Sequence, residues 1–185
     1  MKTLDHGRVT DSIRSATRDV FSLMMGLEIQ AEAPYEEANS TGNVDGVVAL
    51  IGLAGQWTGG GILQCDAGLA RKFYSSLLAT ECPADSDGVT EEVLDAVAEI
   101  ANMIIGNVKN EIERDLGPIG MGIPSVVYGR NFTTRNAGSN WIVSPFSCDG
   151  GRMLVKFCLT QPASGGGSAE LLGREFPRTK HAAPA

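Results

Sequence analysis

The sequence predicts an α/β (α+β) protein in which helices cover a sheet. Three segments place apolar residues at helical spacing, and they alternate with short runs rich in Val, Ile and Leu that are typical of strands. Glycine-containing turns join two pairs of these runs, as in antiparallel hairpins. The length of 185 residues, with 43% hydrophobic and 20% charged residues, fits one domain with a sizeable core.

In the first half, we expect a helix over 11–25, a strand over 27–33, a polar loop over 36–43, a central strand over 44–54 and a returning strand over 61–65. Asp11 is a suitable N-cap for the helix and Gly26 a suitable end. The run Gly59–Gly61 lacks the lysine and the spacing of a phosphate-binding loop. We therefore interpret it as a hairpin turn.

In the second half, we expect a helix from the N-cap Asp66 to Leu78, a linker over 83–88, a long helix over 90–116, irregular sequence over 126–138 and strands over 125–128, 141–146 and 153–160. Thr90 is the expected N-cap of the long helix, and Gly117-Pro118 ends it. A turn over 148–151 joins the last two strands. The composition then shifts to Gly, Ser, Ala and Pro, which predicts a domain over 1–161 and a flexible tail over 162–185.

The long helix carries the most informative pattern of the chain. At about 100° per residue, Asp95, Glu99, Asn102 and Gly106 fall within roughly 60° of one another, opposite an apolar face. We call these four residues the polar stripe, and Met103 flanks it. An asparagine inside a helix costs a few tenths of a kcal/mol relative to alanine, so its presence suggests a use.

The spacing of Glu99 and Asn102 is weak evidence by itself. Glu36 and Asn39 repeat it in a predicted loop, and most such pairs are merely a solvated helix face. In its helical setting, however, the frame Asp-x-x-x-Glu-x-x-Asn-x-x-x-Gly resembles the CheX family of bacterial chemotaxis phosphatases, of the CheC/CheX/FliY class. The resemblance extends to the glycine-rich hairpin over 51–61. It implies a mostly antiparallel sheet packed by helices, and a homodimer that pairs through sheet edges.

The resemblance also implies an activity, the hydrolysis of the aspartyl phosphate of a phosphorylated CheY-like receiver protein. Asn102 would orient the attacking water, and Glu99 would dock by pairing with a lysine of the receiver. The receiver would supply Mg²⁺, so no cofactor of the chain's own is implied. Asp95, Met103 and Gly106 are candidate partner-binding residues, although solvation of Asp95, an edge-of-core role for Met103 and a structural role for Gly106 stay open.

Two other functions remain possible on the sequence. A non-catalytic adaptor would bind a receiver through the same face and leave its phosphate lifetime unchanged. A dimerisation module would not need Glu99 or Asn102 for binding a partner. The intact Glu/Asn pair favours the enzyme, because an adaptor has no need of an amide that positions water.

An internal similarity at an offset of 80 residues predicts a duplicated helix-plus-sheet unit. The segment 15–26 aligns without a gap with 95–106, and both end in glycine. Asp19 and Ser22 occupy the positions of Glu99 and Asn102. They lack the longer reach of glutamate and the amide of asparagine, so we expect the first helix to be catalytically silent.

Composition excludes several other classes. A net charge of −7 without a basic cluster argues against nucleic acid. The chain starts without a secretory pattern and has no run of about 18 apolar residues, so no membrane segment is expected and the cytoplasm is the default location. Cys65, Cys82, Cys148 and Cys158 have neither C-x-x-C spacing nor a nearby histidine, which argues against a metal site.

Overall fold

The computed structural model describes residues 4–38, 43–82, 88–134 and 140–161. The predicted tail over 162–185 and most of the predicted linker over 83–88 lie outside these ranges. In chain order, the elements are α1 (His6–Met25), β1 (Gln30–Ala31), β2 (Tyr35–Glu37), β3 (Asn43–Gly55), β4 (Thr58–Cys65), α2 (Ala67–Leu78), α3 (Glu91–Leu116), β5 (Ile119–Met121), β6 (Ser125–Thr133), β7 (Trp141–Cys148) and β8 (Gly151–Thr160).

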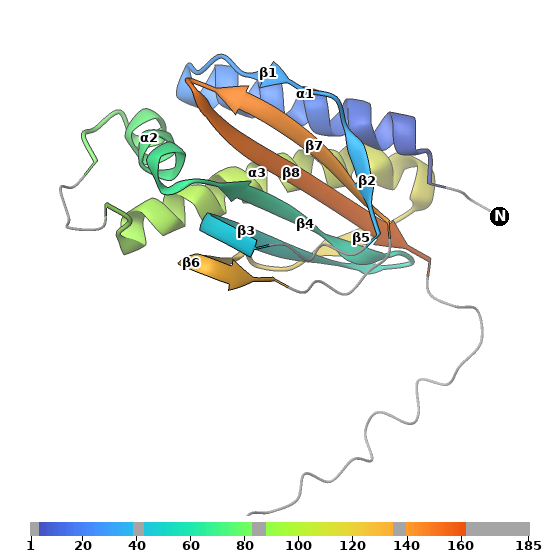
Figure 1. Cartoon of the computed structure of the whole chain (residues 1–185). Coiled ribbons are helices and arrows are strands. Elements are labelled where there is room, and N and C mark those ends of the chain that lie inside the picture. The colour runs from blue at the N-terminus through green and yellow to red at the C-terminus, as the bar shows by residue number, and fades with distance from the viewer. Residues whose placement is uncertain (1–3, 39–42, 83–87, 135–139, 162–185) are drawn as a thin grey trace, which may run out of the picture.

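The strands form one antiparallel sheet, and the helices cover one of its faces (Figure 1). The strand order is β1-β7-β8-β4-β3-β5, with β2 also pairing with β7 and β6 also pairing with β3. The main core lies between this sheet and the three helices. The predicted fold class is therefore confirmed.

The topology also confirms the predicted pseudo-repeat. One half of the chain runs α1-β1-β2-β3-β4, and the other runs α3-β5-β6-β7-β8. Exchanging the corresponding strands of the two halves turns the strand order into its own reverse. The sheet therefore has a pseudo-twofold axis between β4 and β8, and α1 and α3 are equivalent helices. Helix α2 has no counterpart within the described residues.

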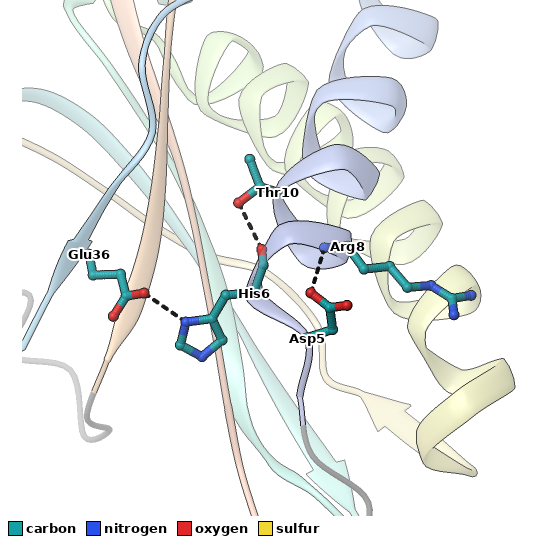
Figure 2. A network of polar contacts seen from close by, with 5 residues as sticks. All are labelled: Asp5, His6, Arg8, Thr10 and Glu36. Carbon is teal, nitrogen blue, oxygen red and sulfur yellow. Dashed lines mark hydrogen bonds and ion pairs between the residues drawn. The ribbon is translucent and has the colours of Figure 1, made fainter.

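The first helix begins earlier than the sequence predicts. Its N-cap is Asp5, whose side chain accepts a hydrogen bond from the backbone N–H of Arg8 at 3.2 Å (Figure 2). The prediction of Asp11 as the cap was wrong because the apolar face of the helix already includes Val9, which is 1% exposed. Next to the cap, His6 Nδ1 lies 2.7 Å from Glu36 Oε1 and links α1 to β2. Gly26 ends the helix in the left-handed conformation, as predicted.

The segment after α1 contains less strand, and its loop less irregular structure, than expected. Only Gln30–Ala31 of the predicted strand over 27–33 pairs with β7. Tyr35–Glu37, which overlaps the predicted loop over 36–43, pairs with β7 as well. The cause is tertiary, because these short edge segments are extended only where β7 offers free hydrogen-bonding groups.

The run Gly59–Gly61 is part of β4 and not a hairpin turn. The chain turns at Gln56 and Trp57 instead. A Cβ atom at Gly59 would lie 1.9 Å from the carbonyl oxygen of Cys158, and one at Gly61 would lie 2.5 Å from Ile105 Cδ1. The absent side chains therefore allow a neighbouring strand and helix α3 to approach closely.

The region between α3 and β7 is more ordered than predicted. Strand β6 extends to Thr133, so the interpretation of 126–138 as irregular was wrong up to that residue. Residues 135–139 lie outside the described ranges. The three-residue strand β5 was not predicted, because so short a segment carries no periodicity. Both strands pair with the outer edge of β3.

The remaining predicted elements are confirmed within one to three residues. Asp66 caps α2 by accepting a hydrogen bond from Leu69 N at 2.8 Å, and Gly117 ends α3. The turn between β7 and β8 has Asp149 and Gly150 at positive φ, as a tight hairpin requires. No helix in the described ranges is long and apolar enough to cross a membrane.

Candidate functional site

Helix α3 presents the polar stripe on the side opposite its core face. Asp95 and Glu99 are exposed, and Asn102 and Gly106 are half-buried. The buried residues of the helix are Val93, Ala96, Val97, Ile100, Ala101, Ile104, Ile105, Val108, Ile112 and Leu116. The structure thus places the four predicted residues along one face, while their functional roles remain predictions.

Packing on several sides holds the stripe in a fixed position. Helix α3 lies against α1, α2 and the sheet. Ile105 packs directly over Gly61 of β4. On the side of α1, Ser12 donates a hydrogen bond to Glu111 Oε2 at 2.6 Å, and Arg8 forms an ion pair with Asp115. Such support lets a side chain on the exposed face act from a rigid base.

The carboxyl end of α3 is tied to strand β5 by Glu113. Its Oε1 accepts a hydrogen bond from the backbone N–H of Ile119 at 2.7 Å, and Oε2 lies 2.9 Å from Lys109 Nζ. The hydrogen bond from Ile119, followed by the interaction with Lys109, lowers the pKa of the Glu113 carboxyl. Glu113 therefore fixes the start of β5 relative to the helix.

The two candidate catalytic side chains are available for a partner. Within the described part of the chain, neither Glu99 nor Asn102 makes a hydrogen bond or ion pair through its side chain. Three cavities lie elsewhere, between α1 and β2, between α2 and β6, and between the ends of α1 and α3. None of these three is lined by the polar stripe. An exposed polar helix face without a cavity fits a protein partner better than a small molecule.

The neighbours of the stripe differ on its two flanks. Met103 is half-buried and packs against the main core, which agrees with the edge-of-core interpretation. On the other flank, Met121 of β5 approaches Gly106, since a Cβ atom there would lie 3.6 Å from Met121 Cε. That distance is an ordinary van der Waals contact. The strand therefore does not require a glycine at this position, and a close approach by a partner remains a reason for it.

The equivalent face of α1 is exposed but differs in chemistry. Asp19 and Ser22 are both exposed. Ser15 donates a weak hydrogen bond to Asp19 Oδ2 at 3.4 Å. No amide group stands at the position that corresponds to Asn102. The geometry of the second helix is thus retained while the pair of side chains is not.

The cysteines play no part in this site. Cys65 is buried in the core, and burial raises the pKa of its thiol to about 12. Burial also raises the pKa of the Cys148 and Cys158 thiols. Their thiolate forms, which metals and electrophiles require, are therefore disfavoured at neutral pH.

A doubly covered helix face of this kind, on a pseudo-symmetric antiparallel sheet, defines a domain that presents a polar helix to another protein. The chain belongs to the family described as "Chemotaxis phosphatase CheX", whose model matches residues 47–147. This match includes all of α3 and confirms the family resemblance drawn from the sequence. No curated protein matches the chain.

Solved structures of other bacterial proteins have the same fold. A putative chemotaxis protein from Desulfovibrio vulgaris Hildenborough is 26% identical, with a TM-score of 0.71 over 82% of this chain and 96% of that chain. CheX from Vibrio vulnificus is 28% identical, with a TM-score of 0.69 over 85% and 100%. CheX in a CheX–CheY–BeF₃–Mg²⁺ complex from Borrelia burgdorferi is 26% identical, with a TM-score of 0.71 over 85% and 99%.

One neighbour of the site was missed by the sequence analysis. Met121 lies in β5, a strand of three residues, and its position over Gly106 depends on contacts distant in sequence. The only local signal is the Gly117-Pro118 break, which requires the chain to change direction after the helix. That signal does not indicate where the chain goes next.

Proposed function

We propose that this chain hydrolyses the aspartyl phosphate of a CheY-like receiver protein. The observation that carries the proposal is the pair Glu99 and Asn102, exposed and unengaged on a rigidly supported helix within the family-matched segment. Membership of the CheX family supports the reaction class. The similarity to a CheX protein in complex with CheY supports the partner.

The chemistry asks little of the helper protein. An aspartyl phosphate is an activated acyl phosphate, and its hydrolysis needs a water molecule placed in line with the leaving oxygen. The amide of Asn102 offers a donor and an acceptor to one water without ionising. The water attacks phosphorus, the bond to the aspartyl oxygen breaks, and inorganic phosphate and a free carboxylate result. Asn102 is therefore the proposed water-positioning residue.

Glu99 is the proposed docking residue. It lies one helical turn before Asn102, and a carboxylate there can form a charge-assisted pair with a lysine of the receiver. Such a pair would fix the register in which the amide reaches the phosphoryl group. Asp95 adds a second carboxylate to the same face. Mg²⁺ would enter with the receiver, so the proposal gives the chain no metal of its own.

The chain also fits a homodimer that pairs through sheet edges, which we propose on family grounds. Strand β6 lies at one edge beside β3, and β1 with β2 lies at the other. Static light scattering after size exclusion would show twice the monomer mass of 19.5 kDa. A mass of one chain at micromolar concentration would rule out a stable dimer.

The direct test is the decay of a phosphorylated receiver with Mg²⁺, alone and with the chain. Asn102→Ala should remove the acceleration, since a loss of about 2.7 kcal/mol of transition-state stabilisation corresponds to roughly a hundredfold in rate. Asn107→Ala is the matched control, because Asn107 is exposed on the same helix outside the stripe. It should decay at the wild-type rate.

The adaptor hypothesis gives a different outcome of the same measurement. In that case the chain binds the receiver, and substitutions at Glu99 weaken binding, but the phosphate lifetime is unchanged at saturating concentration. Unchanged lifetimes with every receiver of the source organism would reject the catalytic proposal. Equal loss of activity in Asn102→Ala and Asn107→Ala would reject the role given to Asn102.

A further inference from the structure

The connection between β5 and β6 exposes one large apolar side chain. It consists of Gly122, Ile123 and Pro124, and Ile123 is 88% exposed. Isoleucine is among the residues most often buried in folded proteins. Among the large apolar residues that the structure describes as exposed, Ile123 has the greatest exposure. Its presentation to solvent therefore calls for an explanation.

The backbone of this connection is held in place. Gly122 N donates a hydrogen bond to Gly52 O of the central strand at 2.9 Å. The proline ring restricts the backbone directly after Ile123. Residues on both sides of the connection pair with the same strand, because Met121 lies opposite Leu53 and Ser125 lies opposite Leu50. Ile123 is thus exposed on a fixed support.

The pairing also contains one extra residue. From Met121 to Ser125 the chain takes four residue steps, while strand β3 takes three steps from Leu53 to Leu50. An extra residue on one strand is a bulge, and bulges at sheet edges redirect side chains next to functional sites. Here the bulge coincides with the residue that faces solvent.

The connection adjoins the polar stripe. Met121, two residues before Ile123, lies over Gly106 of the stripe. The hydrogen bond from Ile119 N to Glu113 ties the start of the same short strand to the end of α3. A partner that covers Asn102 and Gly106 would therefore meet the β5–β6 connection next.

We propose that Ile123 is an apolar docking contact for the receiver protein that the polar stripe engages. The inference rests on the proposed function, from which it takes the partner. The bulge in the pairing with β3 and the continuity through Met121 and Gly106 place the contact beside the stripe. Ile123 supplies apolar burial to an interface whose central residues, Asp95, Glu99 and Asn102, are all polar. It acts in binding and not in the chemical step.

The test measures binding of a CheY-like receiver loaded with beryllium fluoride and Mg²⁺, together with phosphatase kinetics. Ile123→Ser should raise the dissociation constant and the KM roughly tenfold, with kcat unchanged, and Ile123→Leu should restore both. Leu23→Ser is the matched control, since Leu23 is 79% exposed on α1, the helix over the other side of the sheet. It should behave as wild type.

The outcomes separate this inference from the proposed function. If the wild type binds the receiver without hydrolysis and Ile123→Ser weakens binding, the docking contact stands and the phosphatase proposal fails. Unchanged binding in Ile123→Ser overturns the docking contact. Dissociation of a homodimer in Ile123→Ser, with receiver affinity per chain unchanged, also overturns it and assigns the residue to contact with a second copy. Thermal unfolding verifies that each variant is folded.

Discussion

Glycine-to-alanine substitutions at two sites on α3 and its contacts should change stability in opposite directions. Gly106 lies inside α3, and a Cβ atom there would meet Met121 at the ordinary distances of 3.6 and 3.9 Å. Glycine inside a helix costs roughly 0.5–1 kcal/mol relative to alanine. Gly106→Ala should therefore stabilise the protein by about that amount.

Gly61 is the matched counterpart on the sheet. A Cβ atom at this position would lie 2.5, 2.6 and 2.7 Å from three side-chain atoms of Ile105. Both residues belong to the packed layer between α3 and β4, so relief requires a shift of the isoleucine or of the helix. Overpacking of this kind costs about 1–3 kcal/mol. Gly61→Ala should therefore destabilise the protein.

The assay is equilibrium urea unfolding, with thermal melting as a second measurement. One kcal/mol corresponds to a change in Tm of roughly 2–4 °C for a domain of this size. Destabilisation of Gly106→Ala by more than about 1 kcal/mol would refute the reasoning, because it would mean that β5 needs the glycine. Neutral behaviour of Gly61→Ala would likewise refute the tight contact with Ile105. If Gly106 also admits a partner, its more stable alanine variant should bind the receiver more weakly.

Three further predictions concern pH, thiols and the second helix. The lowered pKa of Glu113 stabilises the fold above its ordinary value of 4.5, and this stabilisation is lost as pH falls through the lower folded value. Urea unfolding should thus show wild type exceeding Glu113→Gln at pH 6 and the difference shrinking toward pH 3; a constant difference would contradict this. In native protein, Ellman's reagent should label half-buried Cys82 long before buried Cys65, whose pKa is about 12, and equal rates would contradict the burial. Simultaneous replacement of Asp19 and Ser22 by alanine should leave receiver dephosphorylation unchanged, whereas a loss would reveal a second working face.

Local chemistry explains which elements could be predicted. Helix α3 combines a capping threonine, a long apolar face and a terminal Gly117-Pro118, all within one segment, and its predicted bounds are confirmed. Asp66 as the cap of α2 and the turn at Asp149 are signals of the same local kind. Strands β1, β2 and β5 carry no such signal, because two or three residues become a strand only when a neighbour offers hydrogen-bonding groups.

The candidate site divides in the same way. The wheel positions of Asp95, Glu99, Asn102 and Gly106 follow from helical geometry, so the sequence alone placed them on one face. The sequence also placed Asp19 and Ser22 in an equivalent helix, through the similarity at an offset of 80 residues. In both cases the information lies within a segment of fewer than 30 residues.

Only the tertiary structure decided what surrounds that face. The glycines of β4 were misread as a turn, because the reason for them lies in Cys158 and Ile105, far away in sequence. The approach of Met121 to Gly106 and the exposure of Ile123 arise from pairing between β5, β6 and the outer edge of β3. Helical periodicity is set by neighbours three and four residues apart, whereas strand pairing joins residues more than 60 positions apart, and only the folded chain brings those residues together.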